Sequence, residues 1–275
     1  MIDWPKKKRC ALSLTFDMDG ELLWINFLKR RGAKPSPRLV AQGTYGPKVA
    51  MPKILNLLDK YGIKGAFFVP GRTAEIHPNV VKEIANRGHE IGHHGYNHSD
   101  HSTLDQSAEE QEFKKGFEVL KKTGNAVPRG FRLPAGDMSD NTIRLLQASG
   151  FLYDSSMIDN DLPYMLEKGE HPLVELPIPA ELDDWIYYGF SMFPQFEYQS
   201  GPHTAKEFLE ALTSSFDGAY REGVYLSLVM HPQIEGKPAR IAALEQFIKH
   251  VKAKNGTWIA SPQLIAEFWL KHEGF

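Results

Sequence analysis

The sequence lacks several features that would place it in a specialised class of protein. Cys10 is the one cysteine among 275 residues, so no internal disulfide framework can hold the fold. Positive charge is not in excess, because 32 lysines and arginines stand against 34 acidic residues for a net charge of -2. This balance argues against nucleic acid or an anionic membrane as a partner. No apolar run reaches transmembrane length, and the stretch after the basic residues 6–9 is interrupted at Asp17, too early for a secretory signal. We therefore expect a cytoplasmic protein.

What is present is the composition of an ordinary globular protein, 42% hydrophobic and 24% charged. A chain of this length can form one large α/β domain or two small ones. No linker or change in composition divides it, so we expect one domain over residues 1–275. Strand signals alternate with helix signals along the chain, which predicts βαβ units and a parallel sheet. Polar residues follow one strand after another, and this pattern favours a barrel surrounded by helices over an open sheet.

The expected elements follow from apolar periodicity and from the glycines and prolines that interrupt it. Strands are predicted at residues 12–17, 64–70, 90–94, 130–136 with a turn, 151–156, 173–179, 224–230 and 257–260. Helices are predicted at residues 51–61, 72–87, 107–122, 141–148, 208–216, 241–251 and in a last segment through residue 269. The segment 21–45 is long for a connection. It is either a functional lid or a surface loop with a short helix that caps the barrel or makes an oligomer contact.

The stretch that organises the chain is LSLTFDMDGE, residues 12–21. Apolar and polar residues alternate in it, as in a β-strand with one apolar and one polar face. Side chains two apart on a strand point the same way, so Asp17 and Asp19 leave the strand end on the same side if the extended conformation continues. Gly20 then allows the chain to turn away. Two carboxylates aimed at one place repel each other unless a positive charge lies between or beside them.

A second stretch, HGYNH, can hold that charge, because His94 and His98 follow another short strand signal. One carboxylate and two imidazoles, here Asp19, His94 and His98, form a typical ligand set for a catalytic divalent metal with a position left for water. Taken alone, an Asp pair is most often a turn former or helix cap, and a His pair four apart recurs by chance. Together, both motifs follow predicted strands, where sites form in parallel α/β sheets and barrels.

Further candidates complete a hydrolytic site. Asp17, not needed as a ligand, can act as general base for water, and Arg132 can hold it ionised through a charge-assisted hydrogen bond. His231 can protonate a departing nitrogen, and the backbone N–H of Ala135 can help to stabilise an oxyanion. The reaction class is metal-assisted hydrolysis of an amide-like C–N bond. Two alternatives stay open: Arg132 pairs only with a structural acid, or His231 is a satisfied core histidine.

The remaining aromatic and histidine residues are weaker candidates. Trp185 belongs to an aromatic stretch with Tyr187, Tyr188, Phe193 and Phe196, which can line a pocket or stack on a sugar. We expect most of these side chains in the core or at a subunit contact, and keep Trp185 as a candidate substrate contact. His93 should point away from His94 and is interpreted as structural, and His101 as part of a loop.

Four motifs resemble those of the polysaccharide deacetylase superfamily, the NodB-homology or carbohydrate esterase family 4 group: TFDMDG, HEIGHHGYNH, FRLPAG and VMHP. This resemblance implies a distorted (β/α) barrel with one divalent metal ion per chain, zinc in the first place and cobalt, nickel or iron as alternatives. It also implies roles for five residues: Asp17 as base, His231 as acid, and Asp19, His94 and His98 as metal ligands.

The first motif departs from the family pattern, in which the two Asp residues are adjacent, because Met18 separates them here. In this respect the chain resembles a sub-branch with intracellular peptidoglycan deacetylase-like proteins, cyclic imide hydrolases and allantoinase-like enzymes. Further segments similar to that sub-branch are FFVPGRTAE, YDSSMIDNDLPY, LVELPIPAELDDW and HPQIEGKPAR. The resemblance implies a homo-oligomer, a tetramer.

Three functions are therefore considered. The first is N-deacetylation of an acetamido sugar or of a peptidoglycan or chitooligosaccharide fragment. The second is ring opening of a cyclic imide or ureide at the same kind of metal site. The third is a non-catalytic carbohydrate-binding protein on the same barrel, which predicts loss of the base or of a ligand; the sequence keeps both.

Overall fold

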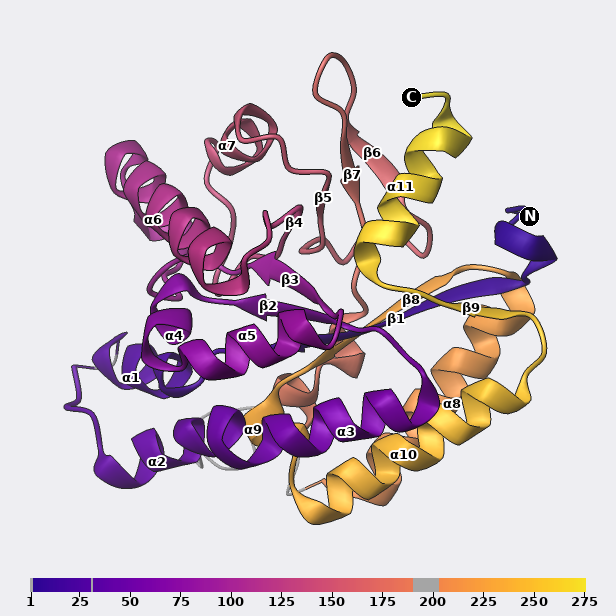
Figure 1. Cartoon of the computed structure of the whole chain (residues 1–275), viewed down its shortest axis with the longest axis horizontal. Helices are drawn as coiled ribbons and strands as arrows, with labels where there is room; N and C mark the ends of the chain where they lie inside the picture. The colour runs from indigo at the N-terminus through magenta and orange to yellow at the C-terminus, as the bar shows by residue number, and fades with distance from the viewer. Residues whose placement is uncertain (1, 31, 190–202) are drawn as a thin grey trace.

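A curled, mostly parallel sheet forms the centre of the protein (Figure 1). The computed structural model describes residues 2–30, 32–189 and 203–275. Within these residues the strands form one nine-stranded sheet. They are β1 (Cys10–Asp17), β2 (Ala66–Val69), β3 (Glu90–His93), β4 (Gly130–Phe131), β5 (Tyr153–Asp154), β6 (Tyr164–Glu167), β7 (Leu173–Glu175), β8 (Tyr225–Met230) and β9 (Thr257–Ile259).

The strands follow the order β6-β7-β5-β4-β3-β2-β1-β8. One edge of β1 pairs with β8 along residues 11–16, and its other edge is shared by β9 at residues 10–12 and β2 at residues 15–17. In the described chain the end strands β6 and β8 do not pair with each other, so the barrel stays open as a half-barrel. The predicted distorted (β/α) barrel is confirmed in this open form.

The expectation of parallel strands alone is wrong at one edge. β6 pairs antiparallel with β7, with an irregular register between Met165 and Glu167. Only residues 168–172 connect the two strands, and a parallel crossover needs a dozen residues or more. A short connection therefore leaves a hairpin as the available geometry.

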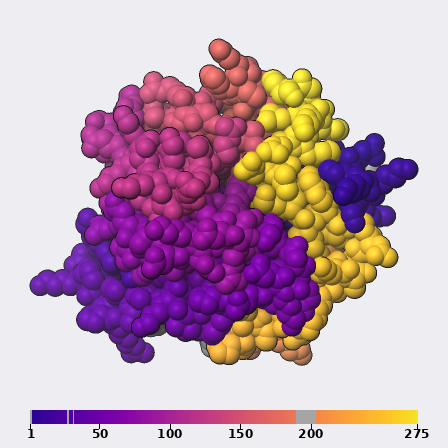
Figure 2. All heavy atoms as spheres, viewed as in Figure 1, coloured from indigo at the N-terminus to yellow at the C-terminus, as the bar shows by residue number. Residues whose placement is uncertain are grey.

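Helices cover the sheet, and viewed as spheres the part of the chain that contains α3, α4 and α5 hides it at the middle of the molecule (Figure 2). The α-helices are α1 (Glu21–Arg30), α2 (Pro37–Tyr45), α3 (Met51–Tyr61), α4 (Gly71–Ile76), α5 (Pro78–Asn86), α6 (Gln106–Gly124), α7 (Thr142–Ala148), α8 (Ala205–Glu222), α9 (Pro232–Glu235), α10 (Pro238–Ala253) and α11 (Pro262–Glu273). Short 3-10 or π-helical turns are η1 (Pro5–Lys7), η2 (Gly46–Ala50), η3 (His101–Thr103), η4 (Ala180–Leu182) and η5 (Trp185–Gly189). No helix in the described part of the chain is both long and apolar enough to cross a bilayer.

Two helical predictions need correction. The single helix expected at residues 72–87 is two helices, α4 and α5, which meet at His77. Proline disfavours the helical conformation of the residue before it, and Pro78 therefore separates them. The segment 21–45, expected as a lid or a loop with one short helix, forms the two helices α1 and α2.

The alternation predicted for β1 is present, but both of its faces are buried. The side chains of Leu12, Leu14 and Phe16 join the largest apolar core with residues of α3, α8 and α10. On the opposite face, Ser13 Oγ donates to the Ala260 carbonyl at 2.9 Å and Thr15 Oγ1 to the Leu228 carbonyl at 2.5 Å. The polar face of β1 thus satisfies its hydroxyl groups within the sheet, and Asp17 ends that face.

A close contact between α2 and the turn after β1 makes the fold and the site interdependent. A β-carbon at Gly43 would meet the carbonyl oxygen of Gly20 and would lie 2.7 Å from Cα of Glu21. These are backbone atoms, which cannot move aside as a flexible side chain can.

We predict that Gly43→Ala lowers the free energy of unfolding by about 1–3 kcal/mol, because overpacking forces the backbone apart. The matched control is Gly218→Ala in α8, where an added β-carbon meets nothing within 4 Å and improved helix propensity should raise stability by about 0.5–1 kcal/mol. Urea unfolding of both variants measures the difference. Equal stabilisation by the two substitutions would contradict the contact.

Candidate metal centre

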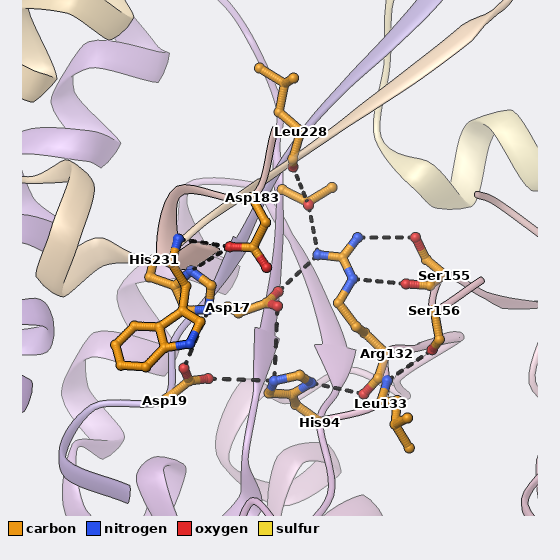
Figure 3. Close-up of polar contacts among 12 residues, drawn as sticks. Asp17, Asp19, His94, Arg132, Leu133, Ser155, Ser156, Asp183, Leu228 and His231 are labelled. Carbon is orange, nitrogen blue, oxygen red and sulfur yellow. Dashed lines mark hydrogen bonds and ion pairs between the residues drawn. The ribbon is translucent and has the colours of Figure 1, made fainter. Parts of the chain in front are cut away.

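The predicted site residues meet at the carboxyl end of the sheet (Figure 3). Asp17 ends β1, His94 follows β3, Arg132 follows β4 and His231 follows β8. A pocket of about 580 Å³ lies at these strand ends, and its walls include Asp17, His98, Arg132, Ala135, Trp185 and His231. The strand ends of a parallel sheet have therefore brought together residues that lie up to 214 positions apart, as expected for α/β proteins.

The three proposed ligands face one another. His94 Nε2 lies 3.4 Å and His98 Nε2 3.5 Å from Asp19 Oδ1, and the three ligand atoms all lie within 4.8 Å of each other. All three side chains are buried. A tetrahedral centre with bonds of about 2.0–2.1 Å has edges of about 3.4 Å between ligand atoms, which matches these distances.

Local backbone geometry directs Asp19 into the site. Met18 N–H donates to the Phe68 carbonyl at 2.8 Å, which extends the pairing of β1 with β2 by one residue, as the sequence predicted. The Met18 side chain enters the apolar core, so Asp17 and Asp19 share the other side. Thr73 Oγ1 donates to the Asp19 carbonyl at 2.8 Å, and Gly20 turns the chain with a φ of 59°.

The two histidines are held from outside the site. His94 Nδ1–H donates to the Arg132 carbonyl at 2.8 Å, which leaves Nε2 with its lone pair toward Asp19. His98 adopts a φ of 59°, a left-handed conformation that is uncommon for non-glycine residues. Asn26 Nδ2 stabilises this turn by donating to the His98 carbonyl at 2.9 Å.

The chemistry of Asp19 fits a cation. Its carboxylate is fully buried, and neither oxygen has a hydrogen-bond donor in the described chain. Burial by itself would raise the pKa of Asp19, but the imidazoles of His98, His94 and His231 hold it well below its usual range. A buried anion without donors, facing two imidazole nitrogens, is a candidate binding site for a divalent metal ion.

Arg132 is the cation that contacts Asp17. Its Nη1 donates to Asp17 Oδ1 and to Thr15 Oγ1, each at 2.8 Å. Nε donates to the Ser155 carbonyl at 2.9 Å and Nη2 to Ser155 Oγ at 3.0 Å. The guanidinium is therefore bound on three sides and is 2% exposed. The second oxygen of Asp17 lies 3.9 Å from His94 Nε2, beside the proposed metal ligands.

His231 has a partner that sequence reasoning missed. Its Nδ1 lies 2.6 Å from Asp184 Oδ1, and its backbone N–H also donates to Asp184. Burial opposes protonation of this ring, but the Asp184 carboxylate, with Asp183 and Asp19, raises the pKa of His231 well above its usual range. Nε2 faces Asp19 Oδ2 at 3.6 Å. Tandem acids in the segment ELDDW were the available signal, but the sequence gives no means to pair them with a histidine 47 residues away.

The pocket walls contain both predicted and unpredicted residues. Ala135 and Trp185 line it as expected, and α1 adds Leu23 and Arg30, which the sequence did not indicate. The Trp185 ring packs edge-on against Trp24 with ring centroids 5.2 Å apart, and lies 6.3 Å from the His231 ring. Part of the segment expected as a lid or loop is thus a helical wall of the pocket.

Other candidates lie away from the pocket or outside the described residues. Tyr187 and Tyr188 pack against Phe208, whereas Phe193 and Phe196 lie outside the described residues. His93 points away from His94, and its Nε2 lies 2.9 Å from the Phe113 carbonyl oxygen. Burial lowers the pKa of His93 to about 3, which agrees with a structural role. His101, expected in a loop, is a buried residue of η3 beside Glu109.

Comparisons with known proteins agree with this geometry. The family model for polysaccharide deacetylase matches residues 43–153. The peptidoglycan deacetylase of Helicobacter pylori is 27% identical over 95% of this chain and 97% of its own length. A solved structure from Mycobacterium smegmatis that bears the polysaccharide deacetylase name is 36% identical, with a TM-score of 0.89 over 99% of this chain and 94% of that one.

The chain belongs to the polysaccharide deacetylase family. The solved structure of Puue allantoinase is also similar, with 27% identity and a TM-score of 0.86 over 99% of this chain and 94% of that one. The family and its neighbours make this protein a metal-dependent, deacetylase-like hydrolase of carbon–nitrogen bonds other than peptide bonds. They do not identify its substrate.

The two aspartates of this deacetylase should differ in what they do. We predict that Asp19→Asn lowers metal affinity by more than the 10–100-fold typical of losing an outer-shell partner, since a ligand charge is removed. Asp17→Asn, the same chemical change two residues away, should keep the metal but lower kcat by about 10²–10⁴, the usual contribution of a general base. Metal content after dialysis and turnover of metal-loaded protein measure both. Full metal content in the Asp19→Asn variant would show that Asp19 is not a metal ligand.

Proposed function

We propose that this deacetylase removes the acetyl group from an acetamido sugar, either a free sugar or a chitooligosaccharide or peptidoglycan fragment. The observation that carries the proposal is the grouping of three sets of residues around one pocket. These sets are the proposed ligands Asp19, His94 and His98, the pair Asp17–Arg132 and the pair His231–Asp184. We also propose that residues 1–275 act as a single catalytic domain.

Asp19, His94 and His98 would hold one divalent cation, for which we propose zinc. One carboxylate oxygen and two imidazole nitrogens are ligands of catalytic zinc sites, and imidazole also suits iron and nickel, with cobalt as a further alternative. When bound there, such an ion supplies Lewis-acid polarisation of a substrate carbonyl and acidifies water.

Asp17 serves as the general base in this proposal. Its Oδ1 is held by Arg132, so its Oδ2 faces the pocket side near His94 and can accept a proton from the attacking water. The guanidinium favours the ionised form of the base by charge and by hydrogen bonding. The contact of Arg132 with the proposed base supports this role over the alternative of a pairing with a structural acid.

His231 serves as the general acid. Asp184 accepts from Nδ1–H and stabilises the protonated ring, which leaves Nε2–H to donate to the departing nitrogen. The backbone N–H of Ala135, in the loop after β4, is proposed to donate to the developing oxyanion. Trp185 covers the His231 side of the pocket and is proposed to contact the sugar.

Ring opening of a cyclic imide or ureide is the second candidate. Two observations favour it: the similarity to Puue allantoinase extends over nearly the whole chain, and α1 with Trp185 adds a wall to the pocket on the side of Leu23. A pocket walled on that side suits a small ring better than a long polymer. The third candidate, a non-catalytic carbohydrate-binding protein, predicts a missing base or ligand, and the proposed set is complete.

Two further proposals concern the oligomeric state of the protein and its location in the cell. The resemblance implies a homotetramer, and the composition implies a cytoplasmic protein that acts on a small molecule or soluble oligosaccharide. Size-exclusion chromatography with light scattering measures the first directly.

A substrate panel decides between the two hydrolytic functions. We predict that the zinc- or cobalt-loaded protein releases acetate from N-acetylated chitooligosaccharides faster than it opens succinimide, hydantoin or allantoin. The Asp17→Asn variant controls for contaminating activity, because it should be inactive on every member of the panel. Preferential opening of the cyclic compounds would replace the first function by the second, and hydrolysis of none would favour the binding protein.

The pair His231–Asp184 predicts a change in pH dependence. Since Asp184 raises the pKa of His231, Asp184→Asn should lower that pKa, and the protonated acid should be lost at lower pH. The alkaline limb of kcat should therefore move down by about 1–3 pH units, the usual effect of a neighbouring opposite charge.

The matched control is Asp183→Asn, because Asp183 Oδ1 lies farther from His231 Nδ1, at 3.6 Å against 2.6 Å for Asp184. Its shift should be smaller. An alkaline limb that stays in place in Asp184→Asn would exclude His231 as the acid.

A further inference from the structure

Two buried carboxyl groups face each other behind the catalytic residues. Asp154 ends β5 and Glu175 ends β7, and they are partners in the parallel register of these neighbouring strands. Both side chains are fully buried. Neither contacts the proposed metal ligands in any hydrogen bond or ion pair of the described chain. Two adjacent buried carboxylates would be costly if both were ionised.

Their hydrogen bonds leave one oxygen of each group for the other. Glu175 Oε1 accepts from the backbone N–H groups of Ser156 and Met157, each at 3.0 Å. Asp154 Oδ1 accepts from Ser156 Oγ at 2.8 Å. The other oxygens, Asp154 Oδ2 and Glu175 Oε2, are buried and have no hydrogen-bond partner in the described chain, although the register of β5 and β7 places the two carboxyl groups side by side. A bond between two carboxyl groups requires a proton on one of them.

The surroundings place that proton on Glu175. Burial and then the neighbouring Asp154 charge raise the pKa of Glu175 well above its usual range. Burial also raises the pKa of Asp154, but the neighbouring Glu175 carboxyl group and the charge of Arg132 favour the ionised form of Asp154. A protonated Glu175 satisfies every contact: its carbonyl oxygen accepts from two N–H groups, and its hydroxyl donates to Asp154.

We propose that Glu175 and Asp154 share one proton and act as positioning residues that hold the segment 155–157 against the catalytic loop after β4. The inference rests on the proposed function, because both connections from this segment end at groups assigned to hydrolysis. The first connection is through Ser155, whose carbonyl and hydroxyl bind the Arg132 guanidinium that holds Asp17. Figure 3 shows these contacts.

The second connection runs toward the proposed oxyanion donor. Ser156 Oγ donates to Asp154. It also accepts from the Leu133 backbone N–H at 2.9 Å (Figure 3). Leu133 begins the sequence Leu133–Pro134–Ala135 that forms part of the pocket wall. The shared proton thus holds, through one hydroxyl, the backbone that carries the Ala135 N–H. A displacement of about 1 Å in such a group can cost 10²-fold in rate.

Two charged or titratable groups from neighbouring parts of the chain interact with the pair. Arg132 follows β4, and Tyr164, whose hydroxyl donates to Asp159, belongs to β6. Arg132 is the cation of these two, and it is already bonded to Asp17 and Ser155. It is not free to neutralise a second carboxylate, so loss of the shared proton would leave two like charges on adjacent strands.

Glu175→Gln and Glu175→Met test the proposal in the full-length, metal-loaded protein. Glutamine reproduces the protonated acid, with an oxygen that accepts and an amide that donates to Asp154, so its kcat should stay close to the wild-type value. Methionine has a similar size but neither group. Its kcat should fall by about 10–100-fold, as for other outer-shell partners, with unchanged metal content and little change in KM.

Two measurements do not depend on turnover. The wild-type minus Glu175→Gln infrared difference spectrum at neutral pH should contain the carbonyl band of one protonated carboxylic acid. Amide hydrogen exchange at Leu133 and Ser156 should be faster in Glu175→Met and close to wild type in Glu175→Gln. If Glu175→Met does not fold, Ser156→Ala removes the connection to Leu133 and should show the same fall in kcat and the same faster exchange at Leu133.

Each result bears on the proposal. Absence of the carboxylic acid band would overturn the shared proton. Wild-type kcat and exchange in Glu175→Met, or in Ser156→Ala where it is the variant used, would overturn the positioning role. If kcat falls as much in Glu175→Gln as in Glu175→Met, the hydrogen-bond donor and acceptor groups at position 175 do not hold the loop. Wild-type protein that hydrolyses no member of the panel would refute the proposed function, while the band and the exchange rates would still decide whether the pair holds the loop.

Discussion

The site depends on one electrostatic constraint, the burial of the Asp19 carboxylate without a hydrogen-bond donor. An ionised carboxylate away from water is unstable unless charge or hydrogen bonds compensate it. Here the compensation comes from imidazoles that reach Asp19 from other strands. Their positions in turn require the extension of β1 beyond Asp17, the turn at Gly20 and the left-handed conformation of His98. The strand order of the sheet therefore matters to function because it brings the ends of β1 and β3 to either side of β2.

Much of this arrangement could be predicted from the sequence because it depends on local periodicity. The period of two along β1 places Asp17 and Asp19 on one side and sends Met18 into the core, and the structure has this geometry. Eight of the nine strands and most of the long helices followed from apolar spacing for the same reason, whereas β6 was not predicted. The helix break before Pro78 was also encoded locally, but the apolar stripe on both sides of it led to one helix instead of two.

Features that depend on which distant segments meet could not be predicted. Asp184 and His231 lie 47 residues apart and pair only because η5 is folded over the end of β8. Asp154 and Glu175 face each other because of strand register, which no single strand specifies. The helical wall that α1 forms in the pocket is of the same kind. Sequence reasoning thus found the residues whose role follows from their own strand, and missed the partners that orient them.

The charges around the pocket also explain why a metal ion belongs at one place in it. Arg132 neutralises Asp17, and the His231 ring neutralises Asp184. A proton shared by Asp154 and Glu175 would leave one charge instead of two behind the pocket. Asp19 is the acid of the central group whose oxygens have no hydrogen-bond donor in the described chain, and the imidazole nitrogens of His94 and His98 face it at 3.4 and 3.5 Å. Among these acids a divalent ion therefore gains most at Asp19, where two neutral imidazole nitrogens can complete its coordination. Elsewhere it would compete with a guanidinium, an imidazolium or a proton already in place.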